Sequence, residues 1–516
     1  FVSPPNYQLG YFKEFLPRAL PFGAGLLAAH MRKLGEQVRI WDLELQPRSD
    51  QDIVNAAPQK GEGIIFAISC LTPNAAEGYA FAKRARNLAP AARIVYGGIH
   101  PSAVPEEPLR EGYADAVVRG EGEEVFPELL RRWREKKEIA GQLGVSCYDG
   151  DGRIMHGEPA PFVLDLDAYP SFPYDLVDVS KYHLGMVSTS RGCPYNCIFC
   201  SQRLISGRRY RYRSTANVIT ELDFLVNHCH QTTCMFVDDY FTANPQRVAE
   251  LCSAIRQRRL HEKVSFAAQV RADSLSPEIL REMRASGFSS LSFGLETASE
   301  NIMTFIDKGE TVVEVIHGAK LAIKEGFNAE GVFIFGFPGE TLKDRLRCFR
   351  LANELGMGRL RVNNIIPYPG TRLFYMLQKQ GCLTIHKGWR NFNSAGAASS
   401  RLTGNFMLPF VPEGVTDGAL QGEVLMANMI FYLNLRKLAN MITRVREPSG
   451  IGFELTLRQL LQPVKIIHFI LAVATMVMRT LWFLLTEKEC RHFLWLILIK
   501  RLPDFEPSVR QALSEN

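Results

Sequence analysis

Three cysteines lie close together in the sequence, at Cys193, Cys197 and Cys200. Their spacing is x3 and then x2, so the three thiols fall within eight residues of chain. Thiolates held this close on a loop cannot all point away from one another, and soft metal centres are the sites that use such groups. The spacing therefore predicts a metal site.

The number of cysteines bears on which metal is bound. Structural zinc sites and most iron–sulfur clusters have four protein ligands, but no fourth Cys or His lies at a usable local distance, and Cys229 and Cys234 follow in a different kind of segment. A [4Fe–4S] cluster on three thiolates leaves one iron open for a small-molecule ligand. Zinc on three thiolates has to recruit a fourth group from elsewhere, so the cluster needs fewer assumptions and zinc is the alternative.

This segment resembles the signature of the radical S-adenosylmethionine (SAM) enzymes, C-x3-C-x2-C with an aromatic residue before the third Cys, which is Phe199 here. The resemblance implies that the open iron chelates the amino and carboxylate groups of SAM, and that an electron from the cluster cleaves SAM to a 5′-deoxyadenosyl radical. It implies that Cys193, Cys197 and Cys200 are the metal ligands, that Phe199 lies beside SAM, and that an external protein such as flavodoxin or ferredoxin donates the electron.

Length and composition limit what surrounds this chemistry. The chain of 516 residues exceeds what one hydrophobic core usually serves, so two or three domains are expected. A net charge of +6 without a long basic run argues against nucleic acid as the principal partner. The dense basic patch at residues 207–213 is expected to be a solvated or SAM-facing loop, and RNA binding through its interleaved tyrosines is the alternative.

The cysteine usage bears on the compartment. Eleven cysteines spread over a long chain without a signal peptide at its start indicate reduced thiols in the cytoplasm. Because the chain opens at Phe1 rather than Met, some N-terminal residues are expected to be missing, and residues 1–5 are expected to end a first strand.

Strand-like and helical stretches alternate in a first domain, residues 1–165. This βαβ pattern predicts a parallel, doubly wound, Rossmann-like sheet, whose ligands bind at the carboxyl ends of the strands. Those ends carry residues 69–72, 97–101 and 120–123, where paired glycines allow close approach to a bulky ligand or simply a tight turn. On these residues alone the ligand is a nucleotide, a corrin or nothing. The expected strands are 37–41, 63–69 and 93–96, and the expected helices are 21–34 and 75–88.

Together with the cysteines, most of residues 1–130 resembles the cobalamin-binding domain found ahead of many radical SAM domains. The mutase-type pattern D-x-H-x-x-G, whose His ligates cobalt, is replaced by Asp-Leu-Glu-Leu-Gln at residues 42–46. No imidazole is therefore expected below the cobalt, and His100 is expected to hydrogen-bond the backbone rather than bind cobalt. A domain that has lost its cofactor is the alternative. The residues implied at the corrin and its nucleotide tail are Ser69, Leu71, Thr72, Gly97, Gly98 and His100.

A second domain, residues 166–390, starts at a proline-rich linker and repeats a strand–loop–helix unit six times. This pattern predicts a partial (β/α)6 barrel with its chemistry at the carboxyl ends of the strands. The resemblance implies that Asp238 and Asp239 hold the SAM amino group and that Glu296 contacts its ribose. Arg271 is suited to a bidentate pair with a carboxylate and is also expected to bind SAM. The expected strands are 186–189, 234–237, 265–270, 290–294, 331–336 and 361–366.

The last region, residues 391–516, is expected to be mostly helical, after a loop at 391–404 near the mouth of the barrel. Residues 464–486 are apolar except for Lys465, His468, Thr475, Arg479 and Thr486. On a helix these residues form one polar seam, completed by Ala472 and Trp482. An arginine near a bilayer centre costs roughly 2.5–3.5 kcal/mol, so Arg479 disfavours a transmembrane anchor.

A second apolar run, residues 493–499, is too short to span a bilayer and is bracketed by Arg491 and by Lys500 and Arg501. Three interpretations of residues 464–501 stay open. They form a helical pair on a membrane surface, with basic edges, at the inner face of the cytoplasmic membrane. They cover a pocket for an apolar substrate. Or they are plain core helices of a C-terminal cap.

Together these features predict a cobalamin-dependent radical SAM methyltransferase acting on an apolar or lipid-like small molecule. The resemblance implies that one SAM methylates the cobalt and that a second yields the radical, which removes hydrogen from an unactivated carbon that then takes the methyl group. The alternatives are a cyclase or oxidising enzyme with the same cofactors, and a non-catalytic corrin-binding sensor. A tRNA methylthiotransferase is disfavoured, because its N-terminal domain should carry a second cysteine triad and only Cys70 and Cys147 lie there.

Overall fold

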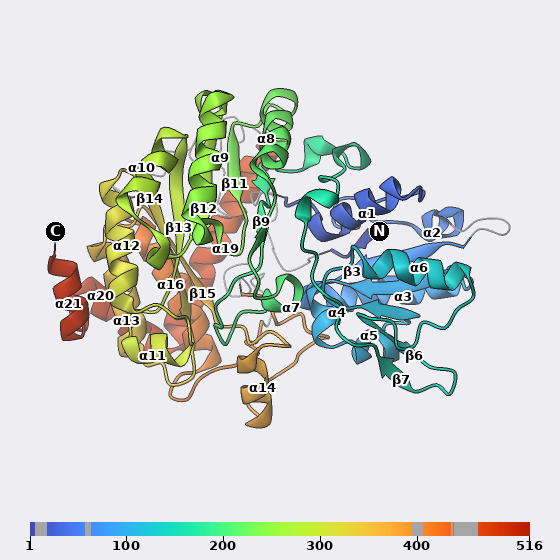
Figure 1. Ribbon diagram of the computed structural model, residues 1–516. Coiled ribbons are helices and arrows are strands. Elements are labelled where there is room, and N and C mark those ends of the chain that lie inside the picture. The colour runs from blue at the N-terminus through green and yellow to red at the C-terminus, as the bar shows by residue number, and fades with distance from the viewer. Residues whose placement is uncertain (6–17, 57–62, 395–405, 435–436, 438–462, 516) are drawn as a thin grey trace.

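The computed structural model describes residues 1–5, 18–56, 63–394, 406–434, 437 and 463–515. Its two large sheets lie side by side, the N-terminal one in blue and the second one in green to orange in Figure 1. The segment that carries the cysteines runs between them. Because most of residues 395–405 and of 435–462 fall outside the described ranges, the expected loop at 391–404 is described only up to residue 394.

The N-terminal sheet has seven strands in the order β2-β1-β3-β4-β5-β6-β7. Strands β1 to β5 are parallel, as predicted, and strand order reverses between β1 and β3, which is where such sheets bind ligands. The strands are β1 (Val2–Ser3), β2 (Trp41–Asp42), β3 (Ile65–Ser69), β4 (Arg93–Gly97), β5 (Ala116–Val118), β6 (Val145–Tyr148) and β7 (Ile154–His156). The helices are α1 (Phe22–Lys33), α2 (Asp50–Ala56), α3 (Ala75–Leu88), α4 (Ile99–Ala103), α5 (Glu106–Arg110) and α6 (Val125–Arg134).

Two features of this sheet differ from the prediction. Strands β6 and β7 extend it in the antiparallel direction, through a turn in which the Asp149 carboxylate accepts hydrogen bonds from the backbone of Asp151 and Arg153. The Asp-Gly pair at this turn is a hairpin signal that the βαβ pattern concealed. The strand expected at 37–41 is regular only at β2, because its one partner, β1, is two residues long.

The second sheet is the predicted partial barrel, with six parallel strands in the order β15-β14-β13-β12-β11-β8. The strands are β8 (Met186–Val187), β11 (Thr233–Phe236), β12 (Ser265–Val270), β13 (Phe288–Glu296), β14 (Asn328–Phe335) and β15 (Arg359–Asn364). The helices are α7 (Arg203–Ser206), α8 (Thr215–Asp223), α9 (Pro245–Gln257), α10 (Pro277–Ala285), α11 (Glu300–Phe305), α12 (Val312–Lys324), α13 (Leu342–Glu354) and α14 (Arg372–Lys379). A short antiparallel ladder joins β9 (Ser190–Arg191) to β10 (Arg211–Tyr212).

The helices of the barrel begin where the sequence supplies capping side chains. In six of them a Ser, Thr or Asn oxygen accepts a hydrogen bond from the third helical N–H group, which satisfies a donor that the helix itself leaves open. These caps make each strand-to-helix turn short and defined, so the polar residues at the strand ends stay near the sheet. The capping residues are Ser214, Asn244, Ser276, Thr311, Thr341 and Thr371.

The open edge of the barrel is covered by a C-terminal helix, α16 (Asp417–Tyr432). The Asn428 side chain accepts from the Val362 N–H and donates to the Val362 carbonyl, both at 2.9 Å. The Tyr432 hydroxyl lies 3.0 Å from both the N–H and the carbonyl of Leu360. Side chains of α16 thus replace the neighbouring strand that β15 lacks, which leaves this edge unable to pair with another chain.

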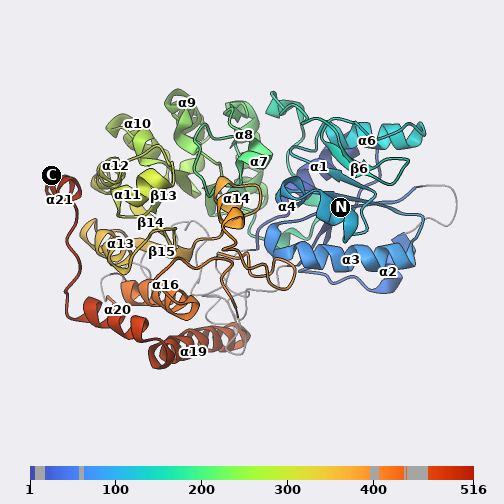
Figure 2. The same cartoon turned by 90° about the horizontal axis from the view of Figure 1, so that it is seen from below.

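The remaining helices are α19 (Pro463–Thr486), α20 (Lys488–Leu498) and α21 (Pro507–Ser514). Figure 2 shows α19 and α20 as an outer layer, on the far side of α16 from the sheet. Thr475 and Arg479 of the predicted seam are buried, and an Arg479 N–H lies 3.4 Å from the Gln421 side-chain oxygen of α16. Trp482, expected on the seam, points outward, and Phe483 is buried instead. The side chains of Lys465, His468 and Ala472 lie outside what is described. None of the helices, as far as their residues are described, is both long and apolar enough to cross a bilayer.

Replacing Asn428 by Ala should expose the edge strand locally. The Val362 N–H would lose the side-chain oxygen that accepts its hydrogen bond, at a cost of about 1–3 kcal/mol, so its hydrogen exchange should speed up by roughly 5- to 150-fold. Hydrogen exchange of a peptide covering β15 measures this. Gln246→Ala on the exposed side of α9 is the matched control, and equal exchange in both variants would contradict the edge-covering role of α16.

Candidate active site

The cysteine segment forms a loop between β9 and α7, at the carboxyl end of β8. It begins at Gly192, which has a φ of +91°. A Cβ atom at this position would clash with the Arg209 carbonyl oxygen, so only glycine fits here. Backbone hydrogen bonds then fix the loop. Ile198 donates to the Ile306 carbonyl at 3.0 Å and accepts from the Leu373 N–H at 3.0 Å. The loop is therefore anchored to segments from the middle and the end of the barrel.

The three thiols of this loop are free and partly buried. Burial raises the pKa of Cys197 to about 12 and that of Cys200 to about 11. Such thiols are protonated at neutral pH, so a metal centre has to displace protons to bind. In the described ranges, no three Cys, His, Asp or Glu side chains converge to hold a single metal ion. Three free thiols on one loop are soft donors, which fits an iron–sulfur cluster.

The two neighbouring aspartates after β11 have different surroundings. Asp238 is buried, and its carboxylate accepts hydrogen bonds from the Thr189 N–H at 2.7 Å, from the Thr189 hydroxyl at 2.8 Å and from the Ser190 N–H. Asp239 accepts from the Gly192 N–H at 3.1 Å and from the Gln202 side chain at 2.9 Å. Asp238 thus holds the turn that leads into the cysteine loop, and only Asp239 also lines a cavity beside it.

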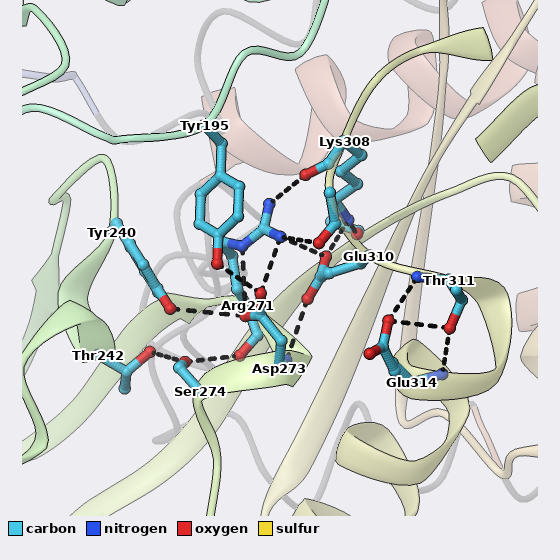
Figure 3. Close-up of polar contacts among 12 residues, drawn as sticks. Tyr195, Tyr240, Thr242, Arg271, Asp273, Ser274, Lys308, Glu310, Thr311 and Glu314 are labelled. Carbon is cyan, nitrogen blue, oxygen red and sulfur yellow. Dashed lines mark hydrogen bonds and ion pairs between the residues drawn. The ribbon is translucent and has the colours of Figure 1, made fainter. Parts of the chain in front are cut away.

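Arg271, at the end of β12, is engaged by the protein itself (Figure 3). Its guanidinium carbon lies 3.3 Å from the ring centroid of Tyr195, which stands between Cys193 and Cys197. It also pairs with Asp273 at 3.0 Å. The guanidinium that was expected to bind SAM is therefore held against the cysteine loop.

Glu296 ends β13 with a φ of 60°, a strained conformation for a side-chain-bearing residue. Its carboxylate lies 3.8 Å from the Nζ atom of Lys308, which also hydrogen-bonds the Gly294 carbonyl. Burial raises the pKa of Glu296, against the lowering effect of Lys308. The Glu296 charge also helps to raise the pKa of Cys197 and of Cys200, so this carboxylate lies within electrostatic range of the two thiols.

Phe199, the aromatic residue before the third cysteine, packs beneath the loop. Its ring centroid lies 5.7 Å from that of Phe337, in the turn after β14. The Gly336 N–H in the same turn donates to the buried Glu340 carboxylate at 2.5 Å. This hydrogen bond holds the turn against which Phe199 packs.

A cavity of about 310 Å³ lies at the carboxyl ends of β3, β4 and β5, beside α1. Three of the predicted cobalamin residues, Ser69, Gly97 and Gly98, line it. A Cβ on Gly97 would meet only the Val118 carbonyl oxygen, at 3.8 Å, whereas one on Gly98 would lie 2.8 Å from the Cys70 carbonyl oxygen. Glycine at position 97 therefore keeps space open at the strand end, which fits a bulky flat ligand. From the barrel side, the lining includes Arg191, Gln202 and Asp239.

The other three predicted cobalamin residues are not part of this lining. Leu71 is exposed and Thr72 is buried. His100 is fully buried, with its Nε2 atom 3.2 Å from the Tyr79 hydroxyl and 3.7 Å from a Glu107 oxygen. The expected hydrogen bond of its ring to the backbone is replaced by these side-chain contacts. Glu107 also accepts from the Trp389 indole, at 2.7 Å, so this polar cluster joins the N-terminal sheet to the segment after the barrel.

A buried ion-pair cluster joins the turn after β5 to the cysteine loop. Glu121 pairs with Arg191 at 3.0 Å and with Arg211 at 2.8 Å, and Glu123 pairs with Arg191 at 2.7 Å. Arg211 belongs to the basic patch that was expected to be solvated or to face SAM, yet it is buried. Arg213 of the same patch pairs with Glu221 at 2.5 Å. These two charges are neutralised inside the protein, which leaves less of the patch for RNA.

Comparison with known proteins agrees with this geometry. Residues 187–370 match the model of the radical SAM superfamily, and residues 12–130 match that of the B12 binding domain. An uncharacterized methyltransferase, PH0819, of Pyrococcus horikoshii is 35% identical over 381 residues, which cover 72% of this chain and 82% of that protein. The chain belongs to the radical SAM superfamily, among the members with a B12-binding domain.

This radical SAM protein has two further kinds of relative. An anaerobic magnesium-protoporphyrin IX monomethyl ester cyclase of Cereibacter sphaeroides is 29% identical over 331 residues, 61% of this chain and 53% of that protein. A hopanoid C-3 methylase of Methylococcus capsulatus is 27% identical over 391 residues, 72% of this chain and 71% of that protein. The fold is that of the cobalamin-dependent SAM radical enzyme OxsB, with a TM-score of 0.65 at 16% identity over 99% of this chain and 83% of the OxsB chain.

The radical SAM protein is thus an enzyme whose cofactors are a [4Fe–4S] cluster, SAM and cobalamin. It acts on a small molecule, and methyl transfer is the activity that its relatives support best. When bound, the cluster supplies the electron that cleaves SAM, and the corrin supplies a site for the methyl group. The predictions of a domain without its cofactor and of a non-catalytic sensor are not supported by these relatives.

Gly97→Val should block cobalamin binding and leave cleavage of SAM intact. The added side chain would project into the cavity at the strand end without meeting the backbone closely. Retention of the corrin absorbance after gel filtration measures binding, and formation of 5′-deoxyadenosine measures cleavage. Gly98→Val is the contrasting variant: at a φ of +94° and with a Cβ 2.8 Å from a backbone oxygen, it should lower the melting temperature. Full cobalamin retention by a folded Gly97→Val protein would contradict the assignment.

Proposed function

We propose that this enzyme transfers a methyl group to an unactivated carbon of an apolar small molecule. The observation that carries the proposal is one cavity lined from both halves. Ser69 and Gly97 come from the corrin side. Arg191 comes from the start of the cysteine loop, and Asp239 comes from the turn after β11 that hydrogen-bonds this loop. Methyl transfer between two cofactors needs both at contact range of the substrate, which such a shared space provides. An apolar substrate is supported by the hopanoid methylase relative.

We assign roles to the residues of the site on the contacts described above. Cys193, Cys197 and Cys200 hold the cluster. Asp239 and Glu296 face SAM, because one lines the cavity and the other lies near the thiols. Asp238 and Phe199 do not contact SAM in this assignment. They hold the loop that carries the cluster. The electron comes from a low-potential protein of the flavodoxin or ferredoxin class in the cytoplasm.

An anaerobic assay distinguishes this activity from its rivals. Protein reconstituted with iron, sulfide and cobalamin should convert SAM to both S-adenosylhomocysteine and 5′-deoxyadenosine in the presence of a bacterial lipid extract and a reductant. With methyl-deuterated SAM, one lipid should gain a labelled methyl group, which mass spectrometry detects. The label should be absent with Cys197→Ala.

The outcomes of that assay separate the candidate functions. A cyclase or oxidising enzyme would form 5′-deoxyadenosine and leave the lipid unlabelled. A corrin-binding sensor would form neither product. Either result would overturn methyl transfer to an apolar substrate.

We also propose that residues 464–501 contact a membrane surface. The outward faces of α19 and α20 carry large apolar side chains, among them Trp482 (63% exposed), Leu485 (79%) and Leu498 (67%). Arg491, Lys500 and Arg501 are exposed beside them. The inward face buries Arg479, so the costly charge of α19 is turned away from a bilayer. Aromatic and aliphatic side chains with a basic fringe suit an anionic lipid surface, where an apolar substrate resides.

Flotation with lipid vesicles tests this contact. The protein should float with vesicles that contain an anionic phospholipid and less with neutral ones. A Leu481→Gln and Leu485→Gln double variant should lose roughly tenfold or more in binding, because about 0.8 kcal/mol is lost per buried methylene. Leu164→Gln, at a similarly exposed leucine (61%) that belongs to neither α19 nor α20, is the control. Dimerisation without vesicles, or equal flotation of all variants, would contradict the proposal.

A further inference from the structure

A buried network of charges supports the cysteine loop from the barrel side (Figure 3). Tyr195 lies two residues from Cys193 and from Cys197, and its hydroxyl donates to the Asp273 carboxylate at 2.6 Å. The Arg271 guanidinium covers the face of the Tyr195 ring at 3.3 Å. A cation over an aromatic face is attracted by the electrons of the ring, so these contacts hold the middle of the cysteine loop in place.

Glu310 links Arg271 to a second cation. Its side chain has no exposed surface, and its oxygen lies 3.0 Å from the Nζ atom of Lys308 and 3.5 Å from Arg271. Glu310 also accepts a hydrogen bond from the Asp273 N–H at 3.1 Å. Two cations and two carboxylates therefore form one set of charges inside the protein.

The backbone of residues 308–310 closes this network around the ring. Arg271 donates to the Lys308 carbonyl at 3.0 Å. Gly309 has a φ of +72°, and a Cβ on it would lie 2.9 Å from Tyr195 Cδ1. The ring is thus held by a guanidinium and a glycine backbone, with no space for an added side chain, which makes its position specific.

We propose that Arg271 is a positioning residue that fixes the cysteine loop through Tyr195, and that the charges of Arg271, Lys308 and Glu310 set the reduction potential of the cluster. The second part rests on the proposed cluster at the three cysteines. A positive charge near a cluster favours its reduced form, and in a poorly solvated site the effect is large. Reduction precedes SAM cleavage, so the network would control how readily the enzyme starts its reaction.

This role differs from direct binding of SAM by Arg271. The guanidinium of Arg271 forms hydrogen bonds and ion pairs with Asp273, with Glu310 and with the backbone of residues 308–309. Its flat face packs on the ring of Tyr195. A SAM ligand at this place would have to displace contacts that hold the cysteine loop. The two roles predict different effects of substitution, because a ligand changes the affinity for SAM and a positioning charge changes the potential without SAM.

A redox titration followed by electron paramagnetic resonance, without SAM, tests the charge effect. Arg271→Gln should shift the midpoint potential to a more negative value, and Glu310→Gln should shift it to a more positive value. The two potentials should shift in opposite directions because the two variants remove opposite charges. Loosened packing would not produce this pattern, because it does not depend on the sign of the charge removed. Arg281→Gln is the control. Arg281 lies on α10, is exposed and pairs with Glu325, so its replacement should leave the midpoint potential unchanged.

Hydrogen exchange of the cluster-free protein tests the positioning separately. Hydrogen exchange in a peptide covering residues 192–202 should be faster in Tyr195→Leu and Arg271→Gln than in the wild type. Arg271→Lys keeps the positive charge, so its midpoint potential should lie closer to the wild-type value than that of Arg271→Gln. Its hydrogen exchange should stay as fast as in Arg271→Gln. Unchanged exchange would overturn the positioning role whether or not the cluster forms. Equal or same-sign potential shifts in Arg271→Gln and Glu310→Gln would overturn the charge effect, whereas wild-type protein that binds no cluster would overturn the proposed function instead.

Discussion

Buried ion pairs of Glu121 and Glu123 with Arg191 and Arg211 hold the N-terminal sheet against the cysteine loop. They connect the turn after β5 directly to the strand that precedes the first cysteine. Removing one partner from a buried pair typically costs 3–5 kcal/mol, because the other charge is left uncompensated. The same contact that orients the two halves thus brings the corrin-side glycines and the cysteine loop to one cavity.

The six-stranded sheet of the barrel ends at β15, whose edge has to be covered by another element. Helix α16 covers that edge with side-chain hydrogen bonds to β15 and is held by an ion pair between Glu423 and the buried Arg345 of α13. Helices α19 and α20 then pack on α16 with one face and present apolar side chains with the other. The C-terminal region therefore covers the barrel edge with one face and leaves large apolar side chains exposed on the other.

Much of this fold follows from sequence pattern. The alternation of strands and helices predicted both sheets, since parallel strands with capped helices have a regular period, and α3 and β12 have the predicted bounds. The hairpin of β6 and β7 was missed because its strands are short and its turn lies in a segment read as the end of the domain. The seam predicted for α19 is split by the fold: Thr475 and Arg479 are buried, whereas Trp482 is exposed and its neighbour Phe483 is buried.

The candidate site was less accessible from sequence. The cysteine spacing carries the metal-site prediction by itself, but the partners of a buried charge depend on which strand ends meet in space. Lys308, Glu310 and Tyr195 follow no local pattern, and Glu121 could be recognised only as part of a glycine-rich turn. Asp238 and Arg271 were chosen because they follow strands, and their actual partners, Thr189 and Tyr195, lie on a segment that pattern alone does not place beside them.

The most direct test of this account is the magnetic interaction between the two metal centres. In protein that contains both a reduced cluster and cobalt(II) cobalamin, electron paramagnetic resonance should show the cobalt signal broadened or split, and the effect should vanish in Cys193→Ala. Such coupling is expected if the cysteine loop and the corrin-side glycines face one cavity. Two unperturbed signals from a protein that holds both centres would contradict the shared site.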